Sequence, residues 1–212
     1  STNTKKALTL SDISKIYYHN TPPESKAAKA KDYWLFMYLC NGINVKDMCL
    51  LTYANIKGEV LEFVRAKTAR TKRNVEPIRV AMVDDIKTII ERLGNIRKDD
   101  STYIFPILKA GMSAESQRAT IRQATKVINA NMKAIAGELQ IISGTNTYAA
   151  RHSFSTILQR SGVSTEFISE ALGHSNVKTT QNYLAGFEDS AKLETVKALT
   201  AFKKKSNGKE KK

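Results

Sequence analysis

Apolar residues recur every three to four positions over most of this chain, which is the period of helices that bury one face. A capping box formed by Thr9 and Asp12 marks the first helix, and glycines at 42, 94, 162 and 173 mark the ends of later ones. The pattern predicts helices over residues 9–18, 24–41, 45–51, 82–93, 113–137, 147–161, 164–172, 177–185 and 188–202. The chain is therefore expected to be mainly helical.

Two segments depart from the helical period. Residues 60–64 and 75–80 are rich in β-branched residues and are separated by polar, basic ones, so they predict a β-hairpin. Residues 56–59 before them predict a turn that adds a third strand. The expected fold class is mainly α with a small antiparallel β-sheet, carried by one domain over 9–202. Residues 1–8 are expected to form an N-terminal linker and residues 203–212 a basic, flexible tail.

The composition of the chain bears on whether the protein is exported, membrane-spanning or cytoplasmic. Hydrophobic residues make up 42% of the 212 positions, as in an ordinary globular protein. No apolar run approaches the ~20 residues that cross a bilayer, and the first six residues lack the apolar stretch of a secretion signal. Two cysteines, Cys40 and Cys49, are too few for a disulfide framework or a structural zinc site. An exported or membrane-spanning protein is largely excluded, and the cytoplasm is the expected location.

The charge balance indicates a polyanionic partner. Thirty-four Lys and Arg against 20 Asp and Glu leave a net charge of +14, which favours nucleic acid. Lysines in the last ten residues contribute part of this excess, and such a run is typical of a solvated chain end. A second cluster lies inside the predicted hairpin and consists of Arg65, Lys67, Arg70, Lys72, Arg73 and Arg79.

Three side chains in the C-terminal third are candidates for chemistry. Arg151 lies on the same face of its helix as Phe154 and Leu158, and a guanidinium on an apolar face must be paired or directed at an anion. His174 follows a glycine at a turn between helices, and Tyr183 lies on the next predicted helix. Each one alone has a structural explanation, respectively an ion pair, a solvated loop histidine and a packing tyrosine.

Together the three residues carry a specific pattern. The sequence reads Tyr-Ala-Ala-Arg-His over 148–152, Glu-Ala-Leu-Gly-His-Ser over 170–175 and Thr-Thr-Gln-Asn-Tyr-Leu over 179–184. This pattern resembles the tyrosine recombinase (phage integrase) family, in which an arginine, a histidine and a nucleophilic tyrosine occur in this order and at this spacing. More narrowly, it resembles integrases of mobile elements in Bacteroidetes-type bacteria. A related type IB topoisomerase is disfavoured by the chain length and by the Gly-His-Ser wording.

The resemblance implies a role for each residue. Tyr183 attacks a DNA phosphate to give a 3′-phosphotyrosyl link, while Arg151 and His174 hold the phosphoryl oxygens and Tyr148 assists. Lys67 falls where the family carries a lysine that protonates the leaving 5′-oxygen; its alternative role is that of one more DNA-binding lysine, like Arg65, Arg70, Lys72 and Arg73. The implied reaction, cutting and rejoining of DNA by a site-specific recombinase, needs no metal, ATP or other cofactor.

Two positions depart from the family pattern. Tyr148 stands where the family usually has histidine, and Asn44 stands at the position of the family's first arginine. Asp47, three residues later, still fits the acidic buttress of that arginine. Either a neighbouring cation substitutes, or the chain is a catalytically degenerate DNA-binding accessory protein with the same fold. The candidate cations are Lys46, Arg65, Arg70 and Arg73.

The resemblance also implies partners. We expect double-stranded DNA, a homotetramer on DNA with exchange of the C-terminal helix, and a monomer in free solution. The exchanged helix would present an apolar stripe formed by Leu193, Val196, Leu199 and Phe202, with Gly186 as its hinge. The family normally adds an N-terminal DNA-clamping domain, so we expect the catalytic domain of a longer integrase associated with a bacterial nucleoid.

Overall fold

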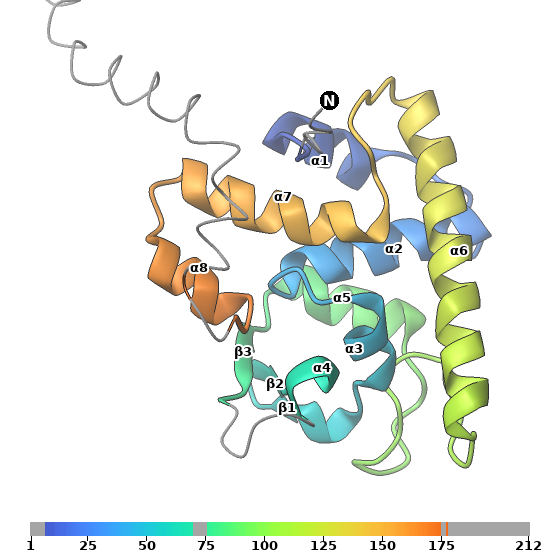
Figure 1. Cartoon of the computed structure of the whole chain (residues 1–212). Helices are drawn as coiled ribbons and strands as arrows, with labels where there is room; N and C mark the ends of the chain where they lie inside the picture. The colour runs from blue at the N-terminus through green and yellow to red at the C-terminus, as the bar shows by residue number, and fades with distance from the viewer. Residues whose placement is uncertain (1–6, 70–75, 175–176, 178–212) are drawn as a thin grey trace, which may run out of the picture.

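The computed structural model describes residues 7–69, 76–174 and 177. Within these ranges the helices are α1 (Leu10–Tyr18), α2 (Lys26–Leu39), α3 (Val45–Leu50), α4 (Ala66–Ala69), α5 (Asp84–Leu93), α6 (Ala114–Glu138), α7 (Thr147–Arg160) and α8 (Thr165–Ala171), with a 3₁₀ turn over Tyr53–Asn55. The strands are β1 (Ile56–Lys57), β2 (Val60–Phe63) and β3 (Ile78–Ala81). The predicted fold class is confirmed (Figure 1). The helix predicted over 188–202, and that over 177–185 except Val177, lie outside the described residues, as do 1–6 and the tail 203–212.

Helix α2 forms the centre of the core. Trp34, Phe36 and Met37 are fully buried on it, and the helix packs against α5, α6 and α7. It begins two residues later than predicted because Glu24 adopts a positive φ of 60°, which leaves Ser25 to cap the helix by accepting a hydrogen bond from the Ala28 N–H. The apolar C-terminal half of α2 therefore provides the surface against which α5, α6 and α7 pack.

Helices α6 and α7 pack on α2 and begin at side-chain caps, Ser113 and Asn146 respectively. The Trp34 indole N–H donates to the Asn146 carbonyl at 3.1 Å, so the start of α7 is fixed to α2. At the other side of α7, the backbone N–H of Leu8 donates to the buried Ser153 hydroxyl at 3.0 Å. The predicted capping box of Thr9 and Asp12 is present at α1.

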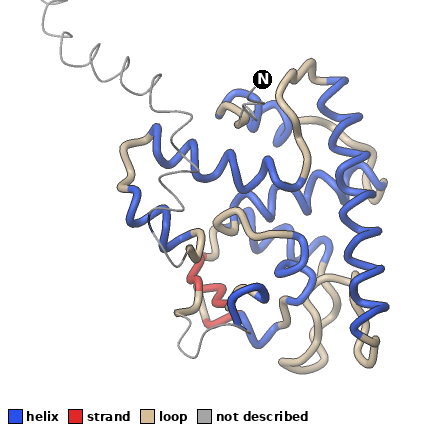
Figure 2. The backbone as a smooth tube through the Cα atoms, viewed as in Figure 1, coloured by secondary structure: helices blue, strands red, loops and turns tan. Residues whose placement is uncertain are grey.

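The sheet is antiparallel with strand order β1-β2-β3, and Figure 2 shows it at one edge of the helical body. Leu61 pairs with Val80 and Phe63 with Ile78, so these four apolar side chains face the core together. The third strand predicted from 56–59 is confirmed. The strand predicted over 75–80 begins only at Ile78 in the structure, because Pro77 has no N–H to donate to a neighbouring strand.

Helix α8 brings the end of the described chain back to the sheet. It packs against α7 and against β3 (Figure 1). Ile168 and Leu172 form a second small core with Phe154, Leu158 and Val163 from α7 and the connecting turn. This packing holds Gly173 and His174 next to α7 and β3.

None of the helices in the described ranges combines the length and the apolar character needed to span a lipid bilayer.

Candidate active site

Arg151 lies at the centre of the site, on α7, and only 7% of its surface is exposed. Its Nη1 donates to the Gly42 carbonyl at 3.0 Å, and its Nη2 donates to the Leu172 carbonyl at 2.7 Å. A buried guanidinium needs acceptors, and here they come from the chain after α2 and from the end of α8. The guanidinium thereby joins three elements that are distant in sequence.

Gly42 makes the close approach to Arg151 possible. It follows Asn41, and both residues have positive φ angles, 61° and 53°, which end α2 and turn the chain towards α3. A Cβ atom on Gly42 would lie 2.6 Å from the Arg151 Cα and 2.9 Å from its Cβ. Since α7 backbone occupies this space, only glycine fits between the two segments.

We expect Gly42→Ala to destabilise the protein by about 3 kcal/mol, because left-handed strain adds to a clash with backbone that cannot rotate away. Gly58→Ala is the matched control, since Gly58 has the same φ of 61° but nothing within 4 Å of an added Cβ. The control should lose only about 1–2 kcal/mol. Urea unfolding of both variants measures the difference, and equal losses would contradict the assigned close contact.

His174 lies directly against Arg151. Its Nε2 is 3.2 Å from the Arg151 Nη2, and because a guanidinium only donates, the imidazole accepts there. Burial, then the charges of Arg151 and Arg65, lower the pKa of His174 to about 4 from its usual 6.5. The ring is therefore neutral at pH 7 in the DNA-free protein.

This lowered pKa predicts a pH dependence of stability. Between pH 6.5 and 4 the unfolded chain binds a proton at His174 that the folded chain does not, so the free energy of unfolding should fall as the pH falls through this window. His174→Gln keeps an acceptor without titrating, and should make the urea midpoint less sensitive to pH between 6.5 and 4. An unchanged pH profile would contradict the prediction.

Arg65 is a second cation at the same place. It follows β2, and its Nη1 lies 3.5 Å from both the Leu172 and the Gly173 carbonyl oxygens. Gly173 has a φ of 62°, and a Cβ there would come within 3.0 Å of the Arg65 Cδ and 2.5 Å of Ile78. The sheet and α8 thus hold Arg65 close to His174, whose pKa it helps to lower.

Asn44 and Asp47 hold the loop that carries Arg65. Asn44 caps α3, with its Oδ1 accepting the Asp47 N–H at 2.9 Å and its Nδ2 donating to the Asp47 carboxylate at 2.5 Å. The buried Asp47 carboxylate also accepts the backbone N–H of Ala66 at 2.9 Å. Asp47 therefore fixes the start of α4, the residue directly after Arg65.

Lys67 does not lie on a strand of a simple hairpin. It lies on α4, a one-turn helix inserted between β2 and β3, and its side chain is exposed. The insertion forms because Asp47 holds the Ala66 N–H and the Ala69 N–H donates to the Arg65 carbonyl at 2.9 Å. The predicted hairpin is confirmed by the pairing of β2 with β3, and the segment between its strands carries this helical turn, which the sequence pattern did not predict.

Tyr148 lies on the first turn of α7 and is 46% exposed, with its ring stacked on His152 at a centroid separation of 6.1 Å. Lys46 is exposed on α3. The predicted residues Tyr183, Arg70, Lys72 and Arg73 lie outside the described residues. The structure thus brings together Arg65, Arg151 and His174 of the predicted set.

Sequence reasoning missed the backbone acceptors of the site, the carbonyl groups of Gly42 and Leu172. The sequence pattern predicts Gly42 only as a helix stop. Glycine is also used where one backbone approaches another closely, and Gly42 does both.

Among the residues that the structure describes, no three His, Cys, Asp or Glu side chains gather where they could hold a metal ion.

The fold defines a class. Helices α2, α5, α6 and α7 around one core, with a three-stranded sheet at its edge, are the catalytic-domain fold of tyrosine recombinases. A crystal structure of XerA recombinase superposes with a TM-score of 0.61 at 19% identity, over 94% of this chain and 65% of that one. The Tn1549 transposon integrase in complex with transposon right end DNA gives 0.59 at 18% identity, over 93% and 67%.

Sequence comparison defines the family. The profile of the phage integrase family matches residues 6–189, so the chain belongs to that family. Tyrosine recombinase XerA of Thermococcus onnurineus is 27% identical over 179 residues, 84% of this chain and 57% of that protein. Tyrosine recombinase XerC of Thermodesulfovibrio yellowstonii is 28% identical over 182 residues, again 84% and 57%. The chain spans a little more than half the length of these relatives.

Proposed function

We propose that this chain is the catalytic part of a site-specific DNA recombinase or integrase that cuts and rejoins DNA through a 3′-phosphotyrosyl intermediate, without metal or ATP. The observation that carries the proposal is the convergence of Arg65, Arg151 and His174 on the carbonyl end of α8. Cationic and hydrogen-bonding donors fixed by the fold can stabilise the charge that develops on a phosphate during displacement. Family membership supports the same activity.

The proposed roles follow the chemistry of each group. Tyr183 is the nucleophile, and Arg151 binds the non-bridging oxygens of the scissile phosphate. His174 is neutral in the DNA-free protein. A phosphate next to it would favour its protonated form, and the imidazolium would then supply a further hydrogen-bond donor to that phosphate. Lys67, exposed on α4, reaches out to protonate the leaving 5′-oxygen, and the half-exposed Tyr148 hydroxyl assists at the phosphate.

We propose that Arg65 replaces the arginine that Asn44 lacks. Asn44 is engaged as a helix cap and bonds to Asp47, whereas Arg65 is close enough to His174 to lower its pKa. Lys46, a competing candidate, is exposed on α3. The Asp47 carboxylate accepts from both the Asn44 Nδ2 and the Ala66 N–H, and through Ala66 it supports the segment that carries Arg65 and Lys67.

Double-stranded DNA is the proposed substrate. The net charge of +14 supports a polyanionic partner, and Arg65, Arg70, Lys72 and Arg73 follow one another in the segment between β2 and β3. The Tn1549 integrase, which shares the fold, was solved in complex with transposon right end DNA. We propose that the scissile strand lies against the face of this chain around α4 and the end of α8.

We also propose the domain bounds, the oligomeric state and the cellular setting of the protein. Residues 9–202 form the catalytic domain, between a linker over 1–8 and a basic tail over 203–212. The protein is a monomer when free and a homotetramer on DNA that exchanges C-terminal helices between subunits. It is the integrase of a mobile element of the Bacteroidetes type. It acts in the cytoplasm of a bacterium, where it associates with the nucleoid.

A nicked suicide DNA substrate tests the function directly. The nick lets the short leaving strand diffuse away, so a covalent protein–DNA adduct accumulates and is seen as a denaturation-resistant band. Digestion and mass spectrometry should map the link to Tyr183. If duplexes from the host element bind with high affinity but give no adduct, the accessory-protein hypothesis replaces this one.

A further inference from the structure

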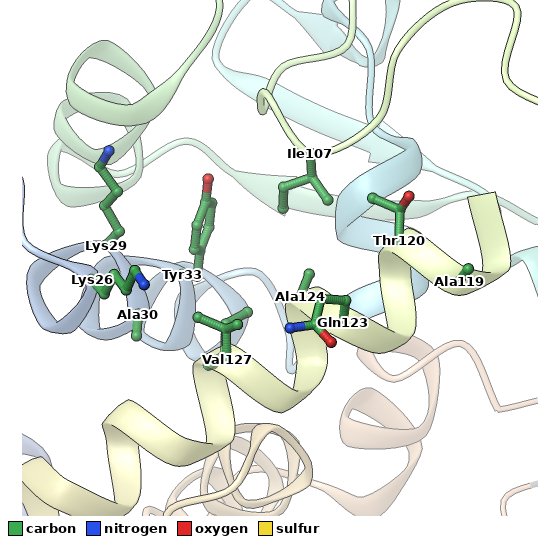
Figure 3. A pocket seen from close by; sticks show the side chains of 11 residues that line it. Lys26, Lys29, Ala30, Tyr33, Ile107, Ala119, Thr120, Gln123, Ala124 and Val127 are labelled. Atoms are coloured by element: carbon green, nitrogen blue, oxygen red, sulfur yellow. The ribbon is translucent and has the colours of Figure 1, made fainter. Parts of the chain in front are cut away.

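An apolar cleft lies between α2 and α6, and none of its lining residues belongs to the site described above. The cleft encloses about 520 Å³, within the range of pockets that bind small molecules. Figure 3 shows side chains of α2 on one wall and of α6 on the other, with Ile107 above them. The apolar lining includes Ala30, Ala124, Val127 and Ile128. A cleft between two packed helices is a common place for a ligand.

The cleft exists because small residues lie where the two helices face each other. Ala30 on α2 and Ala119 and Ala124 on α6 leave space that longer side chains would fill. The buried positions of α6 all fall between Ile128 and Ala136, so in the described part of the chain no layer covers the first half of this long helix. An apolar surface left open in this way indicates a binding site.

Hydrogen-bond donors gather at one end of the cleft. Lys26 and Lys29 stand near the start of α2, and Tyr33 follows one turn later on the same helix (Figure 3). Within the described ranges neither lysine forms an ion pair, and the Tyr33 hydroxyl forms no hydrogen bond. Burial raises the pKa of Tyr33 to about 12, so this hydroxyl remains a donor. The lining contains no acidic residue that would compete for these donors.

These features define the chemistry of a ligand. Two ammonium groups and a hydroxyl at one end favour an anionic head group, since each can donate a hydrogen bond to a carboxylate. From Ala119 to Val127 the α6 wall is about 12 Å long, at ~1.5 Å per residue, which accommodates one extended aliphatic chain. We propose that the α2–α6 cleft binds a medium-chain fatty acid. Its carboxylate lies at Lys26, Lys29 and Tyr33, and its chain extends along α6 towards Ala119.

Both walls of the cleft are joined to the start of α7, the helix that carries Arg151. On α2, the Trp34 indole N–H donates to the Asn146 carbonyl at 3.1 Å. On α6, the Asn129 side-chain oxygen accepts the backbone N–H of Thr147 at 2.8 Å. A ligand that contacts both walls restrains α2 and α6 relative to each other, and therefore also the helix start that both of them hold.

Displacement of a fluorescent fatty acid from the full chain tests the ligand class. The probe is dansyl-labelled undecanoate, whose emission increases in an apolar environment, and the competitors are used below their micelle concentrations. Dodecanoate should displace the probe, and octanoate should bind at least tenfold more weakly, because each buried methylene group raises the affinity roughly fourfold. Dodecyltrimethylammonium has the same chain with a cationic head group and should not compete. Equal competition by the cationic and the anionic amphiphile would overturn the proposal.

Variants of the cleft test the location of the ligand. Ala124→Trp fills the cleft, and Lys26→Glu with Lys29→Glu reverses the charge at its end, so each change should weaken dodecanoate binding at least tenfold. Lys57→Glu with Lys98→Glu is the matched control, since both lysines are exposed, lie outside the lining and change the net charge equally. The control should bind within twofold of wild type. Binding that both cleft variants retain, or that the control loses equally, would overturn the proposal, as would a wild-type chain that binds no dodecanoate.

Hydrogen exchange measured by NMR on the full chain tests the connection to α7. With dodecanoate bound, the Thr147 amide should exchange with solvent at least fivefold more slowly than in the ligand-free protein, because its partner Asn129 lies on the restrained wall. An unchanged Thr147 exchange rate in the bound state would overturn the connection. Neither binding nor exchange requires DNA or its cleavage, so failure of the proposed function is detected separately, by the adduct assay.

Discussion

Arg65→Ala should reduce DNA cleavage by about a thousandfold, close to the loss expected for Arg151→Ala. Removing one preorganised donor to a developing oxyanion typically costs about 10²–10³ in rate, and Arg65 carries a full charge next to His174. Arg65→Lys should recover only part of the activity, because an ammonium lacks the planar pair of donors. Single-turnover adduct formation on the suicide substrate measures all three variants.

The controls for this prediction separate Arg65 from its neighbours. Lys46→Ala should change the rate less than threefold, because Lys46 is exposed on α3. Asn44→Arg should not increase the rate, since the site already has two arginines, and loss of the Asn44 cap would cost about 1 kcal/mol of stability. A wild-type chain that is silent and becomes active with Asn44→Arg would show that Arg65 does not substitute.

Tyr183→Phe should abolish the covalent adduct and leave the affinity for duplex DNA within about twofold of wild type. The substitution removes only the hydroxyl that attacks the phosphate, while the phosphate contacts that dominate affinity remain. Tyr148→Phe is the matched control, since it also removes one phenolic hydroxyl, from a half-exposed ring near Arg151. The control should slow adduct formation by about tenfold and still give an adduct on Tyr183.

Gel shift and adduct assays on the same DNA distinguish the possible outcomes. An adduct that survives Tyr183→Phe would remove Tyr183 from the role of nucleophile. Loss of the adduct in Tyr148→Phe but not in Tyr183→Phe would assign the role to Tyr148 instead.

Local sequence signals predicted most of the secondary structure. The capping box at Thr9, the glycine stops and the apolar period placed α1, α2, α6, α7 and α8 within two residues of their observed bounds. These signals work because caps and amphipathic faces are decided by residues within one or two turns of each other. The small sheet was predictable for the same reason, from β-branched runs on either side of a turn.

The sequence by itself also determined the family resemblance, which the order and spacing of Arg151, His174 and Tyr183 carry. It could not determine which of the candidate cations lies close to His174. In the sequence Arg65 and Lys46 are both simply cationic residues. Only the packing of α8 against β3 brings Arg65 close to His174.

Long-range packing decided the rest. That Lys67 lies on α4 depends on Asp47, whose carboxylate accepts the N–H of Ala66, 19 residues later in the chain. The neutral state of His174 depends on burial between α8, Arg151 and Arg65, which no local pattern encodes. The acceptors of Arg151, two backbone carbonyls 109 and 21 residues away, carry no side-chain signature at all. Contacts of this kind exist only once the chain is folded, because tertiary packing brings distant backbone groups within hydrogen-bond distance.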